Sequence, residues 1–213
     1  MERSPRWRAL SGRLTLGVVT AGVVAKKILK TAEFQTQIVE LGGVTNPAEF
    51  DGVVADAVAA GDSVGGVIEC RVGSIPAGLG EPFWDSVESV VAHALFAVPA
   101  VKGVEFGAGF ECARMRGSEH NDAIIDAQGT TATNNAGGIA GGISNGNEIV
   151  VRAAVKPTAS IGIAQPTYNF ASGQVEPLEI GGRHDACITL RAGVVVECAT
   201  AIALADLTLI AKR

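Results

Sequence analysis

Apolar residues at helical spacing predict two helices in the first third of the chain. The first covers residues 14–30, and its lysines gather in the last turn, where the helix dipole favours cations. The second covers residues 46–60, because Asn46 is a favourable N-cap residue and Pro47 suits the first helical position.

Two further helices are expected in the rest of the chain. Residues 83–98 carry valines and a leucine at helical spacing, and Pro99 ends the stretch. Residues 191–211 are apolar around most of the helix circumference but contain Glu197 and Asp206. These charges favour a buried helix over a membrane span, so no transmembrane segment and no membrane partner are expected.

A segment rich in β-branched residues predicts a strand at residues 64–72. Residues 101–106 and 149–155 are further strand candidates, and the less regular residues 31–44 leave room for another. Helices and strands do not alternate regularly, which argues against a doubly wound parallel sheet and predicts an α+β fold. No repeat or linker divides the sequence, so one continuous domain is expected.

Composition and charge narrow the class of protein. Hydrophobic residues make up 47% of the sequence and charged residues only 18%, which favours a subunit of an oligomer. The net charge of -5 gives no general attraction for nucleic acid, so no nucleic-acid partner is expected. The first ten residues lack the apolar segment of a signal peptide, which predicts a cytoplasmic location.

The cysteines predict neither a metal site nor a disulfide framework. They are widely spaced and form no Cys-x-x-Cys pair. We therefore expect no metal and four buried free thiols, at Cys70, Cys112, Cys187 and Cys198.

A glycine-rich segment at residues 134–146 is the most unusual part of the sequence, with five glycines and three asparagines in thirteen positions. Such a loop exposes backbone N–H groups that can close on a phosphate or a flat ring. A region of tight turns without a ligand is an equally good interpretation. The spacing fits neither the Walker loop nor the dinucleotide fingerprint.

Two other segments carry candidate chemistry. Residues 156–160 follow a predicted strand and combine a cation, two hydroxyls and a proline, which suits an anion or the polar edge of a cofactor. A polar junction between strand and loop is the alternative. Residues 182–185 place an arginine, a histidine and a carboxylate together, as in proton transfer beside an anionic substrate. A solvated, salt-bridged loop is the alternative there.

The two remaining histidines are not expected to be catalytic. His93 lies in an apolar helix and is interpreted as a structural histidine with satisfied hydrogen bonds. His120 is interpreted as a surface or supporting residue, because no nucleophile is evident for it to serve. A hydrolase triad is therefore not predicted.

Taken together, these segments resemble the chorismate synthase family from residue 11 onward. The matching motifs are Ser11-Gly12-Arg13, Ala25-Lys26-Lys27, residues 62–66, residues 78–83, residues 100–105, residues 116–122, the glycine-rich segment, Lys156-Pro157-Thr158 and Gly182-Arg183-His184-Asp185. Their number and order make the resemblance specific.

The resemblance implies an α+β sandwich of helices between antiparallel sheets, a homotetramer, and a binding site for reduced FMN. The implied flavin contacts are Ser11, Pro99, Ala100, Gly141, Lys156, Pro157, Thr158, Ala159, Ser160 and Arg183. The implied substrate contacts are Ser11, Gly12, Arg13, Arg183 and Asp185, with Asp185 as the catalytic residue that assists deprotonation at the flavin's reactive nitrogen. How the flavin is reduced is left open, including whether a flavin reductase or NADP takes part.

The implied reaction is anti elimination of phosphate from 5-enolpyruvylshikimate 3-phosphate (enolpyruvylshikimate phosphate) to give chorismate. Two histidine motifs of the family do not occur in this sequence, which indicates a chain without the N-terminal part of the enzyme; residues 1–10 are unmatched and residues 11–213 form the incomplete domain. We expect low activity for such a chain, because each lost acid-base group costs a factor of roughly a hundred to ten thousand. The alternative is an inactive module that binds flavin or forms oligomers.

One departure from the family motif concerns the loop that carries Asp185. Ala186 stands where the family usually has proline, so a less rigid loop is expected.

Overall fold

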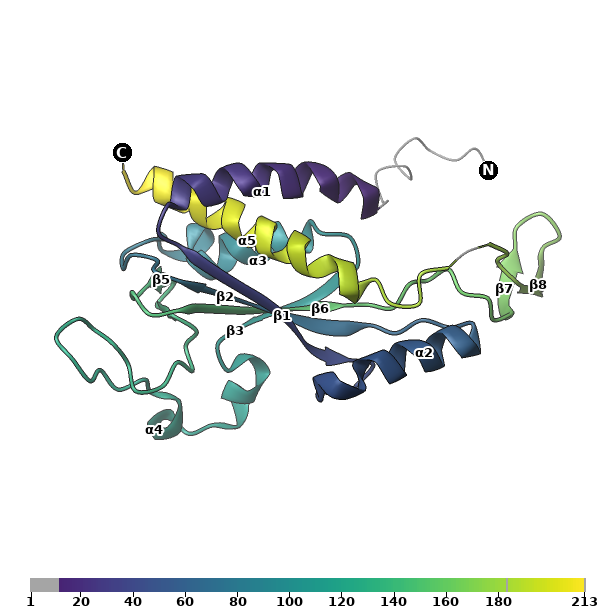
Figure 1. Ribbon diagram of the computed structural model, residues 1–213, viewed down its shortest axis with the longest axis horizontal. Helices are drawn as coiled ribbons and strands as arrows, with labels where there is room; N and C mark the ends of the chain where they lie inside the picture. Colours follow the sequence, from purple (N-terminus) through teal and green to yellow (C-terminus); the bar gives the residue numbers. More distant parts are fainter. Residues whose placement is uncertain (1–11, 183, 213) are drawn as a thin grey trace.

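The computed structural model describes residues 12–182 and 184–212 of the 213-residue chain. At its centre lies a four-stranded sheet in which every neighbouring pair of strands is antiparallel (Figure 1). In spatial order the strands are β1 (Glu33–Leu41), β2 (Gly66–Gly73), β6 (Ile149–Val155) and β3 (Val101–Phe106). The predicted α+β class with an antiparallel sheet is confirmed.

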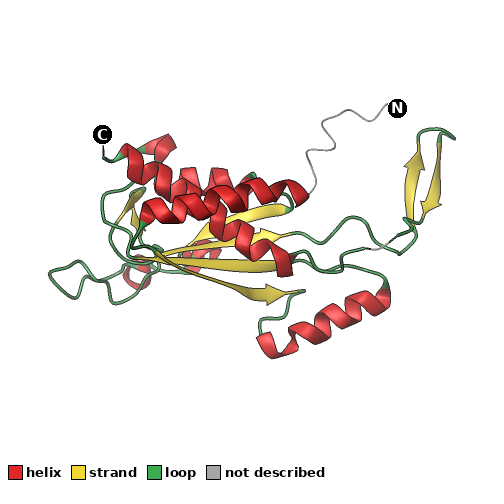
Figure 2. Cartoon of the chain, turned by 45° about the horizontal axis from the view of Figure 1, so that its top comes forward, coloured by secondary structure: helices red, strands yellow, loops and turns green. Residues whose placement is uncertain are grey.

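Three of the helices cover one face of this sheet (Figure 2). They are α1 (Thr15–Leu29), α3 (Val87–Phe96) and α5 (Thr189–Ile210), with α1 packed on α5 as the outermost layer. On the opposite side of the sheet lies α2 (Phe50–Ala60). The smaller elements are α4 (Gly117–His120), β4 (Ile139–Ala140), β5 (Ile143–Ser144), β7 (Gln165–Asn169), β8 (Gln174–Leu178) and 3-10 turns at Gly12–Leu14, Pro47–Glu49, Phe83–Asp85 and Gly109–Arg114.

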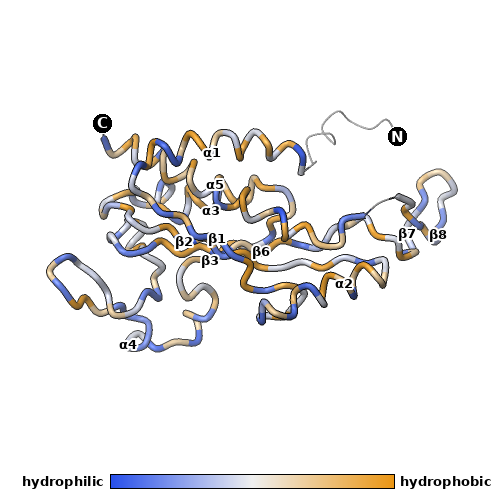
Figure 3. The backbone as a smooth tube through the Cα atoms, viewed as in Figure 1, coloured by the Kyte–Doolittle hydropathy of each residue, from blue (hydrophilic) through white to orange (hydrophobic). Residues whose placement is uncertain are grey.

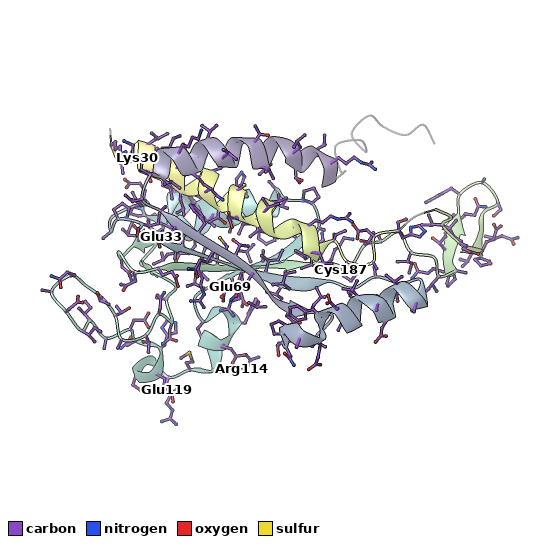
Figure 4. The ribbon with its side chains drawn as sticks, viewed as in Figure 1. Lys30, Glu33, Glu69, Arg114, Glu119 and Cys187 are labelled. Carbon is purple, nitrogen blue, oxygen red and sulfur yellow. The ribbon has the colours of Figure 1, made fainter. Side chains whose placement is uncertain are left out.

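The hydrophobic core lies between the sheet and the helices. Hydrophobic positions, coloured orange, recur along the traces of these elements in Figure 3. Alternate residues of β2, namely Ile68, Cys70 and Val72, are fully buried on this side. The polar positions between them form ion pairs: Arg71 Nε lies 2.7 Å from the Glu69 carboxylate. Glu69 is labelled among the side chains in Figure 4. Successive side chains of a strand point to opposite faces of the sheet. Ile68, Cys70 and Val72 therefore face the core, and the charged residues of β2 lie on the other face.

Helix α5 is a core helix. It packs against α1, α3, β1 and β2, and its buried residues include Val196, Thr200 and Leu204, each without exposed surface. Within the described residues it has the length and apolarity that a membrane span also requires. Composition alone therefore does not distinguish a core helix from a membrane-spanning helix. The prediction of a buried helix is confirmed by this packing.

Most elements agree with the sequence, with one clear error. The strands predicted at residues 101–106 and 149–155 have those bounds in the structure, and Asn46 Oδ1 accepts a hydrogen bond from Ala48 N–H, as expected of an N-cap. The helix predicted from residue 83 begins only at Val87. The reason is that Ser86 caps it, with its hydroxyl oxygen accepting from Ser89 N–H at 3.1 Å.

The hairpin formed by β7 and β8 was not predicted. It projects from the end of the molecule in both ribbon views (Figures 1 and 2), and Pro166 and Pro177 lie opposite each other within it. Prolines argue against a strand when read from sequence, which explains why this segment gave no strand signal.

The cysteines depart from expectation at one position. Cys70, Cys187 and Cys198 are buried, whereas Cys112 is exposed, because it lies in the 3-10 turn at residues 109–114, which the sequence did not predict. Burial raises the pKa of the Cys70 thiol to about 11. Cys70 is therefore an inert core residue at neutral pH.

A test of the helix layer uses two glycines of α1. A Cβ at Gly22 would lie 2.8 Å from the Cys198 Cα of α5, whereas a Cβ at Gly17 meets no atom within 4 Å. Gly17→Ala should stabilise the chain by about 1 kcal/mol through helix propensity. Gly22→Ala should instead lower the free energy of unfolding, because overpacking costs about 1–3 kcal/mol. Urea denaturation of both variants measures this, and equal stabilisation by both would contradict the close contact between α1 and α5.

Candidate functional site

The chain leaves the sheet at the end of β6, where it is held against the turn between α3 and β3. Lys156 N–H donates a 2.9 Å hydrogen bond to Ala100 O, and Val155 pairs with Val101. Ala100 has a φ of 75°, which a residue with a Cβ adopts rarely and at a cost. Pro99 and Ala100 therefore lie beside Lys156, although more than fifty positions separate them in sequence.

The loop before β2 supports the same segment. The Ser63 hydroxyl donates a 2.7 Å hydrogen bond to Thr158 O. A Cβ at Gly65 would lie 2.5 Å from Val155 O and 3.0 Å from Pro157, so only glycine allows this approach. Residues 156–160 are thus fixed by two separate parts of the chain.

The side chain of His184 joins this segment to the loop before α5. Its Nδ1 lies 2.8 Å from the Ser160 hydroxyl oxygen, and its Nε2 lies 2.6 Å from Ile180 O. A carbonyl oxygen only accepts, so Nε2 carries the hydrogen, and in the neutral ring Nδ1 accepts from Ser160. The two predicted chemical segments, residues 156–160 and 182–185, are therefore in direct contact.

Asp185 forms an ion pair with a residue of α5. Arg191 Nη1 lies 2.5 Å from Asp185 Oδ2. The Asp185 side chain is 30% exposed and that of Arg191 is 76% exposed. The pair lies close to the start of α5, and Val64 N–H donates to Ala186 O at 2.8 Å, which fixes the chain just after Asp185.

One polar group at this junction lacks a partner. The Thr158 hydroxyl is buried and makes no hydrogen bond within the described residues. The Lys156 ammonium donates to Pro157 O at 3.1 Å. A buried hydroxyl without a partner is costly, and together with the ammonium it forms a set of donors suited to an anionic or polar ligand.

The structure brings most of the predicted site residues to one end of the molecule. Pro99, Ala100 and residues 156–160 meet there, and His184 links them to the segment with Asp185. Helices α1 and α5 both begin at this end (Figures 1 and 2), which places Gly12 and Arg13 there. Ser11 and Arg183, also predicted contacts, lie outside the described residues.

Gly141 is the predicted residue that the fold does not bring to this junction. It lies in the turn between β4 and β5, and Val87 N–H, at the start of α3, donates to Gly142 O at 2.9 Å. Pro99 follows the other end of α3, and a ten-residue helix spans about 15 Å. The length of α3 therefore separates Gly141 from Pro99. Gly141 has a φ of 60°, and a Cβ there would meet no atom within 4 Å.

The rest of the glycine-rich segment is held by its own side chains. Asn134 donates to Glu148 O at 2.8 Å and accepts from Gly138 N–H at 2.7 Å. The Asn145 side chain accepts from Asn147 N–H at 3.0 Å. These amides bind the loop itself, as a region of tight turns requires.

Asp122 is a further anchor of this loop, which the sequence did not single out. Its carboxylate accepts from the Thr133 hydroxyl at 2.7 Å and from Asn135 N–H at 2.8 Å. Partial burial alone raises its pKa, but hydrogen bonds from Thr133, Ala136 and Asn135 outweigh burial and lower the pKa below its usual value.

The two histidines outside the junction carry no chemistry there. The expectation of a satisfied structural histidine at His93 was wrong: the residue is exposed on α3, because the apolar stripe of this helix runs through Val87, Val91 and Leu95. His120 is half-buried in α4, away from the junction, and its carbonyl accepts from the Asn135 side chain at 3.2 Å.

Sequence reasoning also missed Arg191 and Ser63. A signal for Arg191 was available, since a lone arginine in the first turn of a helix is disfavoured by the dipole unless it has a partner. No signal identified Ser63, whose contact with Thr158 O depends on the fold.

Comparison with known proteins gives one consistent result. The family model described as chorismate synthase matches residues 6–209. A chorismate synthase of Chitinophaga pinensis is 57% identical over 204 residues, which cover 95% of this chain and 60% of the relative. One of Dehalococcoides mccartyi is 45% identical over 227 residues, with 93% and 62% covered. A solved crystal structure of chorismate synthase has a TM-score of 0.78 at 28% identity, covering 94% of this chain and 65% of that chain. The chain therefore spans less than two thirds of each of these proteins.

Proposed function

We propose that this chain, which belongs to the chorismate synthase family, serves the elimination of phosphate from 5-enolpyruvylshikimate 3-phosphate to give chorismate, with reduced FMN as cofactor. The observation that carries the proposal is the buried Thr158 hydroxyl without a partner, next to Lys156 and the strained Ala100. A ligand that supplies the missing partner removes the cost of this arrangement. Family membership favours the lyase over a module that only binds flavin or forms oligomers.

The residues at the junction suit the polar and anionic parts of FMN. Lys156 supplies a cation, Thr158 and Ser160 supply hydroxyls, and Pro99 and Ala100 supply backbone groups held in place by β3. The family resemblance adds Ser11, Gly141 and Arg183. Ser11 and Arg183 lie outside the described residues, and the place of Gly141 beside the start of α3 does not support it as part of the same site. When bound, reduced FMN supplies transient electron density for the elimination and is unchanged at its end.

The proposed substrate contacts are Ser11, Gly12, Arg13, Arg183 and Asp185. A guanidinium carries a fixed charge and a planar set of donors, so Arg13 and Arg183 suit a departing phosphate. An ionised carboxylate only accepts hydrogen bonds. Asp185 Oδ1 has no partner within the described residues, and is therefore available to take a proton, which supports Asp185 as the catalytic carboxylate.

The same family membership supports further proposals on partners and context. We propose one domain over residues 11–213, a cytoplasmic location and assembly into a homotetramer; a flavin reductase would supply reduced FMN. Exposed apolar side chains on α1, such as Leu16, Val23 and Val24, support assembly, because uncovered apolar patches mark interaction surfaces.

Assembly is tested by sedimentation velocity of the chain at several concentrations. We expect a species larger than a monomer, and Val24→Lys on the outer side of α1 should shift the distribution towards monomer by adding charge to an apolar surface. Lys27→Glu, on an exposed polar position of the same helix, is the control. A monomer at all concentrations would contradict assembly through the chain itself.

The FMN proposal is tested by replacing the hydroxyl that lacks a partner. Thr158→Val removes the hydroxyl but keeps the side-chain shape, so FMN affinity should fall by about two- to tenfold, the value of one hydrogen bond. The stability of the ligand-free chain should be unchanged or higher. Fluorescence titration with FMN and thermal unfolding measure the two effects.

A matched control comes from Thr189, the first residue of α5, whose hydroxyl also has no partner among the described residues but whose side chain has no exposed surface. Thr189→Val should leave FMN affinity unchanged. Absence of FMN binding by the unaltered chain, or an equal loss of affinity in both variants, would contradict the assignment of the Thr158 hydroxyl to the flavin site.

A further inference from the structure

Asp185 is held in a short segment that is anchored on both sides. On one side the His184 ring bonds to both the Ser160 hydroxyl and Ile180 O. On the other side Ala186 O accepts from Val64 N–H. These contacts fix the backbone near Asp185, but they do not fix its side chain.

The only hydrogen bond that the Asp185 carboxylate makes within the described residues is with Arg191. Arg191 Nη1 contacts Oδ2 at 2.5 Å, whereas Oδ1 has no partner there. Arg191 comes from the first turn of α5, which contains no acidic residue. The guanidinium therefore holds one carboxylate oxygen and leaves the other available.

The exposure of the Asp185–Arg191 ion pair argues against a role in stability. Exposed ion pairs contribute little to stability, because water and salt screen them and ordering the side chains costs entropy. Arg191 is also placed where the helix dipole disfavours a cation. A structural contribution does not explain its position, whereas orientation of the carboxylate does.

We propose that Arg191 is a positioning residue that orients the Asp185 carboxylate for its work at the flavin. The inference rests on the proposed function, in which Asp185 acts beside reduced FMN. Arg191 holds Oδ2, so that Oδ1 stays directed away from the guanidinium and accepts hydrogen bonds from ligand groups. Neither the sequence motifs nor the family resemblance assigned a role to Arg191.

The test compares the affinity of the chain for reduced and oxidised FMN under anaerobic conditions. A carboxylate only accepts, and the reduced ring carries an N–H at its reactive nitrogen that the oxidised ring lacks. A well-oriented Asp185 therefore favours the reduced form. Arg191→Gln should lower the ratio of the two affinities by about ten- to a hundredfold, which corresponds to one charge-assisted hydrogen bond.

Three further variants make the result specific. Asp185→Asn should lower the ratio by the same factor, and the double variant should lower it no further, because both changes remove one interaction. Arg191→Lys should restore part of the ratio. Arg114→Gln removes a similarly exposed arginine, 69% exposed and paired with Glu111, and should have no effect.

The outcomes separate the two proposals. If the chain binds FMN and Arg191→Gln leaves the affinity ratio unchanged, the positioning role is wrong while the flavin site stands. If Arg191→Gln weakens both redox forms equally, its role is structural and the inference is likewise wrong. If the unaltered chain binds neither form, the proposed flavin site fails and the positioning role fails with it.

Discussion

The position of β6 between two partner strands is the constraint on which the candidate site depends. β6 is hydrogen-bonded to β2 on one side and to β3 on the other, so the point at which the chain leaves the sheet is fixed from both sides. Lys156 N–H continues the ladder by donating to Ala100 O. The segment that follows, with its cation and two hydroxyls, therefore starts from a rigid edge, as a binding site requires.

The same edge explains why distant segments form one site. The turn after α3 is held there by β3, the loop before β2 is held there by Ser63 and Gly65, and the loop before α5 is held there by His184. These contacts use backbone groups and the polar side chains of Ser63 and His184. Within residues 156–160 the buried Thr158 hydroxyl has no partner among the described residues, and it marks the position where this packing is incomplete without a ligand.

Local patterns in the sequence predicted the elements well where one physical signal dominated. β6 is a run of mostly buried apolar residues, and β3 lies beside it with Val101 buried at its start. Both strands were predicted, and so was the Asn46 cap at the start of its helix. The start of α3 was wrong because the capping hydroxyl of Ser86 decides it within a uniformly apolar stretch. The family motifs predicted which segments belong to the site. They did not predict how these segments contact one another. The contacts of Ser160 with His184 and of Asp185 with Arg191 exist only once the sheet has placed these loops side by side.

The most direct test of the account is a crystal structure of the chain with FMN. We predict the flavin against residues 156–160, with the Thr158 hydroxyl within about 3.2 Å of a ligand oxygen or nitrogen. The β7–β8 hairpin offers a contrasting place, a hollow of about 540 Å³ lined by residues such as Tyr168, Phe170 and Leu178. Flavin bound in that hollow, with Thr158 still unpartnered, would contradict the central claim that the end of β6 forms the cofactor site.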